Sequence, residues 1–134
     1  MSEQDKHLIA AATRARDNAH APYSNFRVGA AVRAKSGRII GGCNVENATY
    51  GLTVCAERVA IWKAISEGER GFDAIAVVTD TDTPTSPCGA CRQIIWEFCG
   101  DVPVVMATLN NGQETKQMRE LMPMAFDSSK LKIS

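Results

Sequence analysis

Three cysteines that lie far apart in the sequence restrict the possible folds of this chain more than any other feature. Cys88 and Cys91 form a C-x-x-C pair directly after Pro87, and Cys55 lies well upstream. C-x-x-C spacing sets two sulfurs about one helical turn apart, so both can reach one ion. With Cys55 as a third ligand, a tetrahedral Zn²⁺ keeps its fourth position open for water. The spacing therefore predicts a zinc site, and a fold that brings Cys55 to the C-x-x-C pair.

The residues around these cysteines suit thiolate ligands. Cys55 opens one predicted helix, and Cys88 and Cys91 lie in the first turn of another. Helix N-termini carry partial positive charge, which favours thiolate over thiol. Three thiolates on Zn²⁺ leave a surplus negative charge, which makes bound water harder to deprotonate. Arg58 lies one helical turn after Cys55 and is predicted to offset that charge through a fork of donors that lysine lacks.

Glu57 indicates what such a site would do. It follows Cys55 by two residues and is not needed as a ligand. A carboxylate at this place can take a proton from zinc-bound water and deliver it to a substrate, as general acid–base catalysis requires. The predicted reaction class is zinc-assisted hydrolysis.

Other interpretations of the cysteines remain open at this point. The C-x-x-C pair is also compatible with a redox pair, or with half of a structural zinc site that needs four ligands. The Cys55-Ala56-Glu57-Arg58 run favours the catalytic interpretation, since neither alternative explains it. We expect Cys43 and Cys99 to be small core residues. The residues available as a fourth ligand are Cys43, Cys99, His7 and His20.

Composition narrows the class of protein. The chain has 134 residues, with 15 basic and 15 acidic side chains and 45% hydrophobic residues. That size and hydrophobic content predict one domain over residues 1–134 with a real core. The balanced charge argues against a nucleic-acid partner, because such binding relies on clustered lysine and arginine. No apolar signal or membrane-spanning run is apparent, and five cysteines fit a reducing compartment, so we expect a cytoplasmic protein.

Local patterns predict an α/β fold. Helical spacing, β-rich runs and turn residues alternate along the chain, with Lys35-Ser36-Gly37 and Asn110-Asn111-Gly112 as turns. The first two strands read as an antiparallel hairpin, and the strand–helix–strand stretches that follow imply parallel neighbours. The predicted helices cover 4–19, 55–67, 88–99 and about 118–121, and the predicted strands cover 26–34, 38–45, 72–79 and 102–109.

Longer motifs resemble one enzyme family. Cys55-Ala56-Glu57 followed by Pro87-Cys88-Gly89-Ala90-Cys91 matches the zinc nucleoside deaminase signature. Residues 22–31 look like the first-strand motif of cytidine deaminases, residues 42–50 like their ribose-binding segment, and residues 121–126 like their C-terminal motif. The chain therefore resembles the small, homotetrameric, three-cysteine cytidine deaminases over nearly its whole length.

The resemblance implies a fold, a reaction and a role for each site residue. The fold would be a three-layer α/β/α sandwich around a mixed five-stranded sheet. The reaction would be the hydrolytic deamination of cytidine and deoxycytidine to uridine and deoxyuridine, with release of ammonia. Cys55, Cys88 and Cys91 would bind Zn²⁺, and Glu57 would carry the proton to the pyrimidine. The implied substrate contacts are the backbone at Ala56 and Ser86 for the pyrimidine edge, Asn44 and Glu46 for ribose hydroxyls, Phe26 for the base or sugar, and Phe126 for the base in a neighbouring subunit's site.

The residues themselves support some of these roles and leave others open. Asn44 and Glu46 stand two apart on a predicted strand, so they share a face, and Glu46 would repel a phosphate and favour a free nucleoside. The alternative for Asn44 is a turn residue. For Phe26 and Phe126 the alternative is ordinary core packing. Tyr50 and Arg27 are further candidates for supporting roles.

Two other substrate classes share the metal chemistry. A different cytosine nucleoside, such as a nucleoside antibiotic, would use the same site. A polynucleotide would need a basic groove that bears aromatic residues. The zero net charge, and the segment that resembles a ribose-binding motif, disfavour such a substrate. A structural zinc module would have four protein ligands and no water on the metal.

Overall fold

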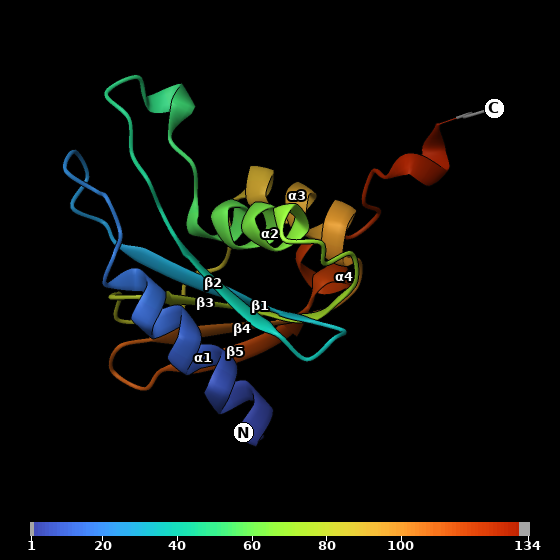
Figure 1. Cartoon of the computed structure of the whole chain (residues 1–134), viewed down its shortest axis with the longest axis horizontal. Coiled ribbons are helices and arrows are strands. Elements are labelled where there is room, and N and C mark those ends of the chain that lie inside the picture. Colours follow the sequence, from blue (N-terminus) through green and yellow to red (C-terminus); the bar gives the residue numbers. More distant parts are fainter. Residues whose placement is uncertain (1, 132–134) are drawn as a thin grey trace.

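A mixed five-stranded sheet forms the middle of the molecule. The computed structural model describes residues 2–131. Within the sheet, only β3 and β4 are parallel neighbours, and the other adjacent pairs are antiparallel. The strands are β1 (Val28–Ala34), β2 (Ile39–Cys43), β3 (Phe72–Thr79), β4 (Pro103–Thr108) and β5 (Gln113–Gln117), in the order β2-β1-β3-β4-β5 (Figure 1).

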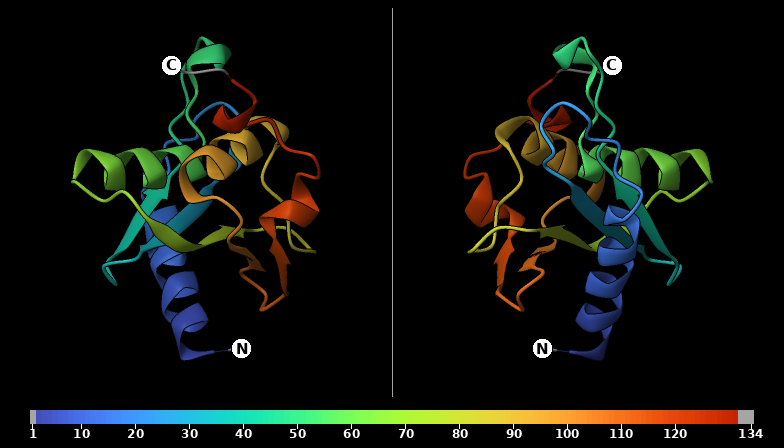
Figure 2. Two further views of the ribbon diagram at one scale, coloured as in Figure 1. Left: turned by 90° about the vertical axis from the view of Figure 1, so that its right-hand side faces the viewer. Right: turned by 90° about the vertical axis from the view of Figure 1, so that its left-hand side faces the viewer.

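Helices cover both faces of this sheet, which confirms the three-layer sandwich. Helix α1 lies on one face, and α2, α3 and α4 lie on the other, as the views of Figure 2 show. None of the helices within residues 2–131 is both long and apolar enough to cross a lipid bilayer. The helices are α1 (Glu3–Arg16), α2 (Ala56–Ser66), α3 (Gly89–Cys99) and α4 (Met118–Leu121), with 3₁₀ turns η1 (Tyr50–Leu52) and η2 (Ser128–Lys130).

Helix ends follow from the local sequence. Ser2 caps α1 by accepting a hydrogen bond from the Asp5 amide, and acidic residues occupy its first turn. Helix α3 ends at Cys99, and its C-cap residue Gly100 has a φ of 76°, which suits glycine. The turn predicted at Asn110-Asn111-Gly112 contains Asn111 with φ 69°, a conformation that asparagine tolerates better than most residues.

Two details of the predicted topology were wrong. The local patterns did not identify β5, whose sequence QETKQ is polar and whose residues are largely exposed. A polar edge strand lacks the apolar alternation by which strands are recognised. The strand–helix–strand rule holds for β3 and β4 but not for β2 and β3, because β1 lies between them and pairs antiparallel with both.

Apolar side chains form one core on each face of the sheet. The strand alternation divides them: Ala30 and Val32 of β1 face α2, whereas Ala31 faces α1. The core under α2, α3 and α4 contains Ile61, Ile75, Ile95, Val104 and Met118 among others. The core under α1 is built from smaller residues, among them Ala12, Ala31, Ala74, Ala76 and Ala107 around Leu8.

Two glycines let helices approach the sheet closely. A Cβ atom on Gly29 of β1 would lie 1.9 Å from the Ala12 carbonyl oxygen of α1. A Cβ atom on Gly42 of β2 would lie 2.4 Å from the Ala60 backbone nitrogen of α2. Since both obstacles are helix backbone, these positions fix the height of α1 and α2 above the sheet. Helix α2 carries part of the candidate site at its N-terminus.

Candidate zinc site and substrate cavity

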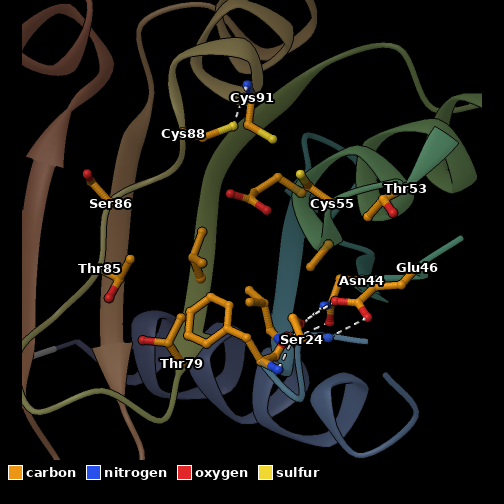
Figure 3. A pocket seen from close by; sticks show the side chains of 15 residues that line it. Ser24, Asn44, Glu46, Thr53, Cys55, Thr79, Thr85, Ser86, Cys88 and Cys91 are labelled. Carbon is orange, nitrogen blue, oxygen red and sulfur yellow. Dashed lines mark hydrogen bonds between the residues drawn. The ribbon is translucent and has the colours of Figure 1, made fainter. Parts of the chain in front are cut away.

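A cavity of about 340 Å³ opens where β1 begins and β3 ends. Val28 and Thr79 are register partners at that edge of the sheet, and both line the cavity. The N-termini of α2 and α3 form its roof (Figure 3). This volume falls in the range of small-molecule sites. The lining residues are Ser24, Phe26, Val28, Asn44, Glu46, Thr53, Cys55, Ala56, Glu57, Val77, Thr79, Thr85, Ser86, Cys88 and Cys91.

The three cysteines predicted from the sequence meet at this roof. Cys55 is the N-cap residue of α2, Cys88 is the N-cap residue of α3, and Cys91 is buried in the first turn of α3. Their three sulfurs lie within 4.8 Å of one another. The Cys91 amide also donates a 3.4 Å hydrogen bond to the Cys88 sulfur. Two helix N-termini therefore point at one cluster of soft donors.

The donor set fits Zn²⁺ with one position left for a non-protein ligand. Among residues 2–131, no further His, Cys, Asp or Glu side chain joins the three sulfurs. The four residues considered as a fourth ligand, Cys43, Cys99, His7 and His20, are therefore not part of the cluster. Three sulfur donors in a compact group suit Zn²⁺ better than a hard cation. All five cysteines are free, so the C-x-x-C pair is not a disulfide.

The cluster already favours loss of a proton. The pKa of Cys55 is lowered to about 6, mainly because the Cys91 thiol donates a hydrogen bond to it and also because Arg58 is close. The same hydrogen bond raises the pKa of Cys91. Burial opposes the charge of Arg58, but the neighbouring Cys91 thiol and the charges of the cysteines raise its pKa overall. Arg58 thus lies close enough to the sulfurs to interact with their charge.

Glu57 lines the cavity beside the sulfurs with its side chain almost fully enclosed. It is only 5% exposed, and burial raises the pKa of its carboxyl to about 7, although the charge of Arg58 works in the opposite direction. A buried carboxyl with a pKa near neutrality can both accept and return a proton. The structure places Ala56 in the cavity as well, between Cys55 and Glu57.

Asn44 and Glu46 reach the cavity from outside the strand in which they were predicted. Strand β2 ends at Cys43, but Val45 still forms bridges to His20 and Val54. This extended backbone keeps the alternation, so the side chains on either side of Val45 line the cavity together. The shared face predicted from the sequence is therefore present.

Both polar side chains also brace the loop opposite them. Asn44 accepts a 2.9 Å hydrogen bond from the Val28 amide and donates a 2.8 Å bond to the Phe26 carbonyl. Glu46 accepts hydrogen bonds from the Tyr23 amide at 2.9 Å, from the Ser24 amide at 3.1 Å and from the Ser24 hydroxyl. These bonds lower the pKa of Glu46, the hydroxyl of Ser24 contributing most. Its carboxylate is thus an anchor for the 23–24 turn.

The structure gives the two aromatic candidates, Phe26 and Phe126, different places relative to the cavity. Phe26 lines the cavity and is 43% exposed, so core packing does not describe it. Phe126 is 57% exposed and does not line the cavity of its own chain. Tyr50 stands on η1 with its ring 6.0 Å from that of Tyr23, in an edge-to-face arrangement. The core alternatives for Phe26 and Phe126 were therefore wrong.

Several lining residues were not singled out by the sequence. Ser24, Thr53 and Thr79 contribute hydroxyl groups, and Thr79 is 1% exposed at the end of the otherwise apolar β3. A hydroxyl chain runs from Thr79 through Thr81 at 2.8 Å to Thr85 at 3.0 Å. The sequence signal for Thr79 was a polar residue at the end of the mostly apolar run 72–79. The other lining residues that sequence reasoning missed are Val28, Val77 and Thr85.

Comparisons with known proteins agree with this geometry. The family model described as the cytidine and deoxycytidylate deaminase zinc-binding region matches residues 2–108. A cytidine deaminase of Sporosarcina psychrophila is 51% identical over 125 residues, which cover 92% of each chain. A blasticidin-S deaminase of Bacillus cereus is 34% identical, with 94% of each chain covered. The crystal structure of a cytidine deaminase from Burkholderia pseudomallei superposes with a TM-score of 0.89 at 46% identity, covering 94% of this chain and 100% of that one.

Proposed function

Because the chain belongs to the cytidine and deoxycytidylate deaminase family of zinc-binding proteins, we propose that it hydrolyses cytidine and deoxycytidine to uridine and deoxyuridine. Ammonia is the second product. The observation that carries this proposal is the convergence of three cysteine sulfurs and the buried Glu57 in one cavity. The same cavity holds Asn44 and Glu46, two polar side chains suited to sugar hydroxyls.

Cys55, Cys88 and Cys91 are the proposed zinc ligands, and the bound metal would supply an acidified water for hydrolysis. Glu57 accepts a proton from that water and delivers it to N3 of the pyrimidine, which makes C4 electron-poor. The hydroxide that remains would add to C4, and Glu57 would carry its proton to the amino group, so that the new C4–O bond replaces the C4–N bond and ammonia leaves. Burial of Glu57 keeps these transfers away from bulk water.

The remaining residues orient the nucleoside and balance charge. Arg58 offsets the negative charge of the thiolates. The backbone at Ala56 and Ser86 faces the pyrimidine edge, and Phe26 packs against the base or sugar. Asn44 and Glu46 bind ribose hydroxyls through the hydrogen-bonding capacity that their loop contacts leave free. The carboxylate of Glu46 disfavours a phosphate on the sugar, which points to free nucleosides as substrates.

We also propose a cytoplasmic homotetramer built from one domain per chain. Phe126 is exposed and outside its own cavity, which supports a role in the site of a neighbouring subunit. A shallow groove on α2 and the preceding loop offers a surface for subunit contact, and it is lined by Val45, Val54, Val59 and Trp62 together with Lys63 and Ser66. The five free thiols fit a reducing compartment.

Ultraviolet absorbance tests the reaction directly. Mixed with the zinc-loaded protein, cytidine is expected to lose its characteristic absorbance as uridine forms, with one ammonia released for each nucleoside converted. A zinc chelator should stop the change, and added Zn²⁺ should restore it. An unchanged spectrum with a fully zinc-loaded protein would contradict the proposed function.

A nucleoside antibiotic is the second candidate substrate, because one relative is a blasticidin-S deaminase at 34% identity. Parallel measurements of ammonia release from cytidine, deoxycytidine and blasticidin S separate the two. We expect the natural nucleosides to give the higher kcat/KM. The zero formal net charge disfavours a polynucleotide substrate, and deamination of a single-stranded oligonucleotide would reverse that conclusion.

A further inference from the structure

Arg92, near the start of α3, donates to three oxygens that belong to two separate segments of the chain. Its Nε donates to the Pro87 carbonyl at 2.8 Å, and its Nη2 donates to the Ser86 hydroxyl at 2.7 Å. Its Nη1 donates to the Leu121 carbonyl at 2.8 Å. One side chain therefore joins the loop before the zinc ligand Cys88 to the end of α4.

These contacts depend on the shape of the guanidinium group. All three acceptors are neutral oxygens, and within residues 2–131 Arg92 takes part in no salt bridge. Hydrogen bonds from a charged donor are stronger than those from a neutral one. A lysine ammonium is a compact charge and cannot reproduce a planar fork that donates in three fixed directions. Through these three hydrogen bonds, Arg92 holds the loop before Cys88 and the end of α4 together.

The loop held by Arg92 forms one wall of the cavity. Ser86 and Cys88 both line it, and Figure 3 shows Ser86 with Thr85 on the side opposite Asn44 and Glu46. The bond to the Pro87 carbonyl fixes the peptide that leads into Cys88. A shift of this loop would move the pyrimidine-facing backbone relative to the opposite wall.

Two further residues of α3 hold the segment that follows α4. Gln93 donates to the Phe126 carbonyl at 2.9 Å, and the Trp96 indole donates to the Asp127 carboxylate at 3.0 Å. Asp127 in turn caps η2 by accepting from the Ser129 amide. Together with the Leu121 carbonyl, α3 holds the C-terminal segment at three points.

We propose that Arg92 is a positioning residue that links the two sites to which one chain contributes. It fixes the Ser86–Cys88 wall of its own cavity and, with Gln93 and Trp96, fixes the segment that presents Phe126 to a neighbouring chain. The inference rests on the proposed function. Helix α3 thereby carries two zinc ligands at its start and supports the aromatic group for another site along its side.

The test compares Arg92→Gln and Arg92→Lys with a matched arginine variant, Arg70→Gln. Arg70 also donates to backbone carbonyls, those of Ile65 at 2.7 Å and Glu69 at 2.8 Å, but it is exposed and lies outside the cavity. Both Arg92 variants are expected to lose about 100-fold in kcat/KM for cytidine per bound zinc, since small misplacements cost that much. Amide hydrogen exchange over residues 121–131 should accelerate in both, and Arg70→Gln should match the wild type.

A double variant distinguishes a link between the sites from general damage. If Arg92 acts partly through Phe126, Arg92→Gln and Phe126→Ala combined should cost less than the product of their separate losses. Should Arg92→Gln fail to fold, Arg92→Lys takes its place in these comparisons. Wild-type kcat/KM in Arg92→Lys, or exchange and rates in Arg92→Gln equal to those of Arg70→Gln, would overturn the proposal. A wild-type protein inactive on cytidine would instead contradict the proposed function, and the exchange measurement would still test these contacts of Arg92.

Discussion

Glu57 combines two properties that substitution can separate: it lies beside the proposed zinc ligand Cys55, and its carboxyl is buried, with a pKa raised to about 7 mainly by that burial. Glu57→Gln keeps the size of the side chain and removes the acid. We expect the variant to bind zinc as the wild type does and to lose at least about 10²–10⁴-fold in kcat, the range for general acid–base catalysis. Metal analysis and ammonia release measure the two properties.

Glu67→Gln is the matched control for this substitution. Glu67 caps the other end of α2 and pairs with Arg38 at 2.7 Å on the surface. Exposed pairs contribute little to stability, so this variant should keep both zinc and activity. A Glu57→Gln variant with wild-type turnover would remove the proposed proton carrier.

Cys99 gives a prediction about pH. Burial raises the pKa of its thiol to about 12, whereas an unfolded cysteine ionises near 8.5. The folded state therefore keeps the proton over that interval, and the contribution of Cys99 to stability, complete below about 8.5, declines as pH rises toward 12. Alkylation by iodoacetamide, which needs the thiolate, should still be rising about tenfold per pH unit between pH 9 and 11 in the native protein.

Mass spectrometry of the peptide that contains Cys99 follows this reaction, and the same peptide in urea is the control. In urea the rate should level off above about pH 8.5. A native protein whose Cys99 rate levels off at the same pH would show that the thiol is not shielded.

At the scale of elements, the close contact between β2 and α2 depends on the absence of a Cβ atom at Gly42. Gly42→Ala would place Cβ 2.4 Å from the Ala60 nitrogen and 3.0 Å from the Ala56 carbonyl oxygen, so α2 must move. Overpacking of this kind costs about 1–3 kcal/mol. We expect the free energy of unfolding to fall by at least about 2 kcal/mol, and kcat/KM to fall as well, because α2 carries Cys55 and Glu57.

Gly51→Ala is the control for this contact, since a Cβ there meets nothing within 4 Å. Urea unfolding of both variants at one protomer concentration measures the difference. Equal midpoints and slopes for Gly42→Ala and the wild type would mean that the sheet and helix can separate without cost.

The elements also show what the sequence could predict. Cysteine spacing predicted the cluster of three sulfurs because cysteines at helix starts have few other uses, and the long periodic segments predicted α1, α2 and α3. Strand β5 was not predicted because a polar edge strand is held by its hydrogen bonds to β4 and not by buried side chains. The hydrogen bonds of Asn44 to the Phe26–Val28 backbone depend on how a loop returns to the sheet, which no local pattern encodes.

At the scale of the whole molecule, α3 makes two sets of contacts, and in the proposed oligomer these would serve the sites of different chains. Its N-terminus serves the cavity of its own chain, whereas its side holds the segment with Phe126, which is exposed and lies outside that cavity. A site completed by a neighbour would lose activity on dilution below the concentration at which subunits associate. The whole assembly, and not one chain, is then the catalytic unit.

Mixing two defective variants tests this arrangement. Phe126→Ala should lower kcat/KM by about 5- to 160-fold, since stacking of a base on an aromatic ring contributes about 1–3 kcal/mol. Glu57→Gln is expected to be nearly inactive but keeps Phe126. After the subunits of the two variants exchange, some sites combine Glu57 from one parent with Phe126 from the other, and activity should rise above the sum of the separate proteins. Activity equal to that sum, in mixtures shown by mass spectrometry to contain hybrid oligomers, would mean that Phe126 serves no neighbouring site.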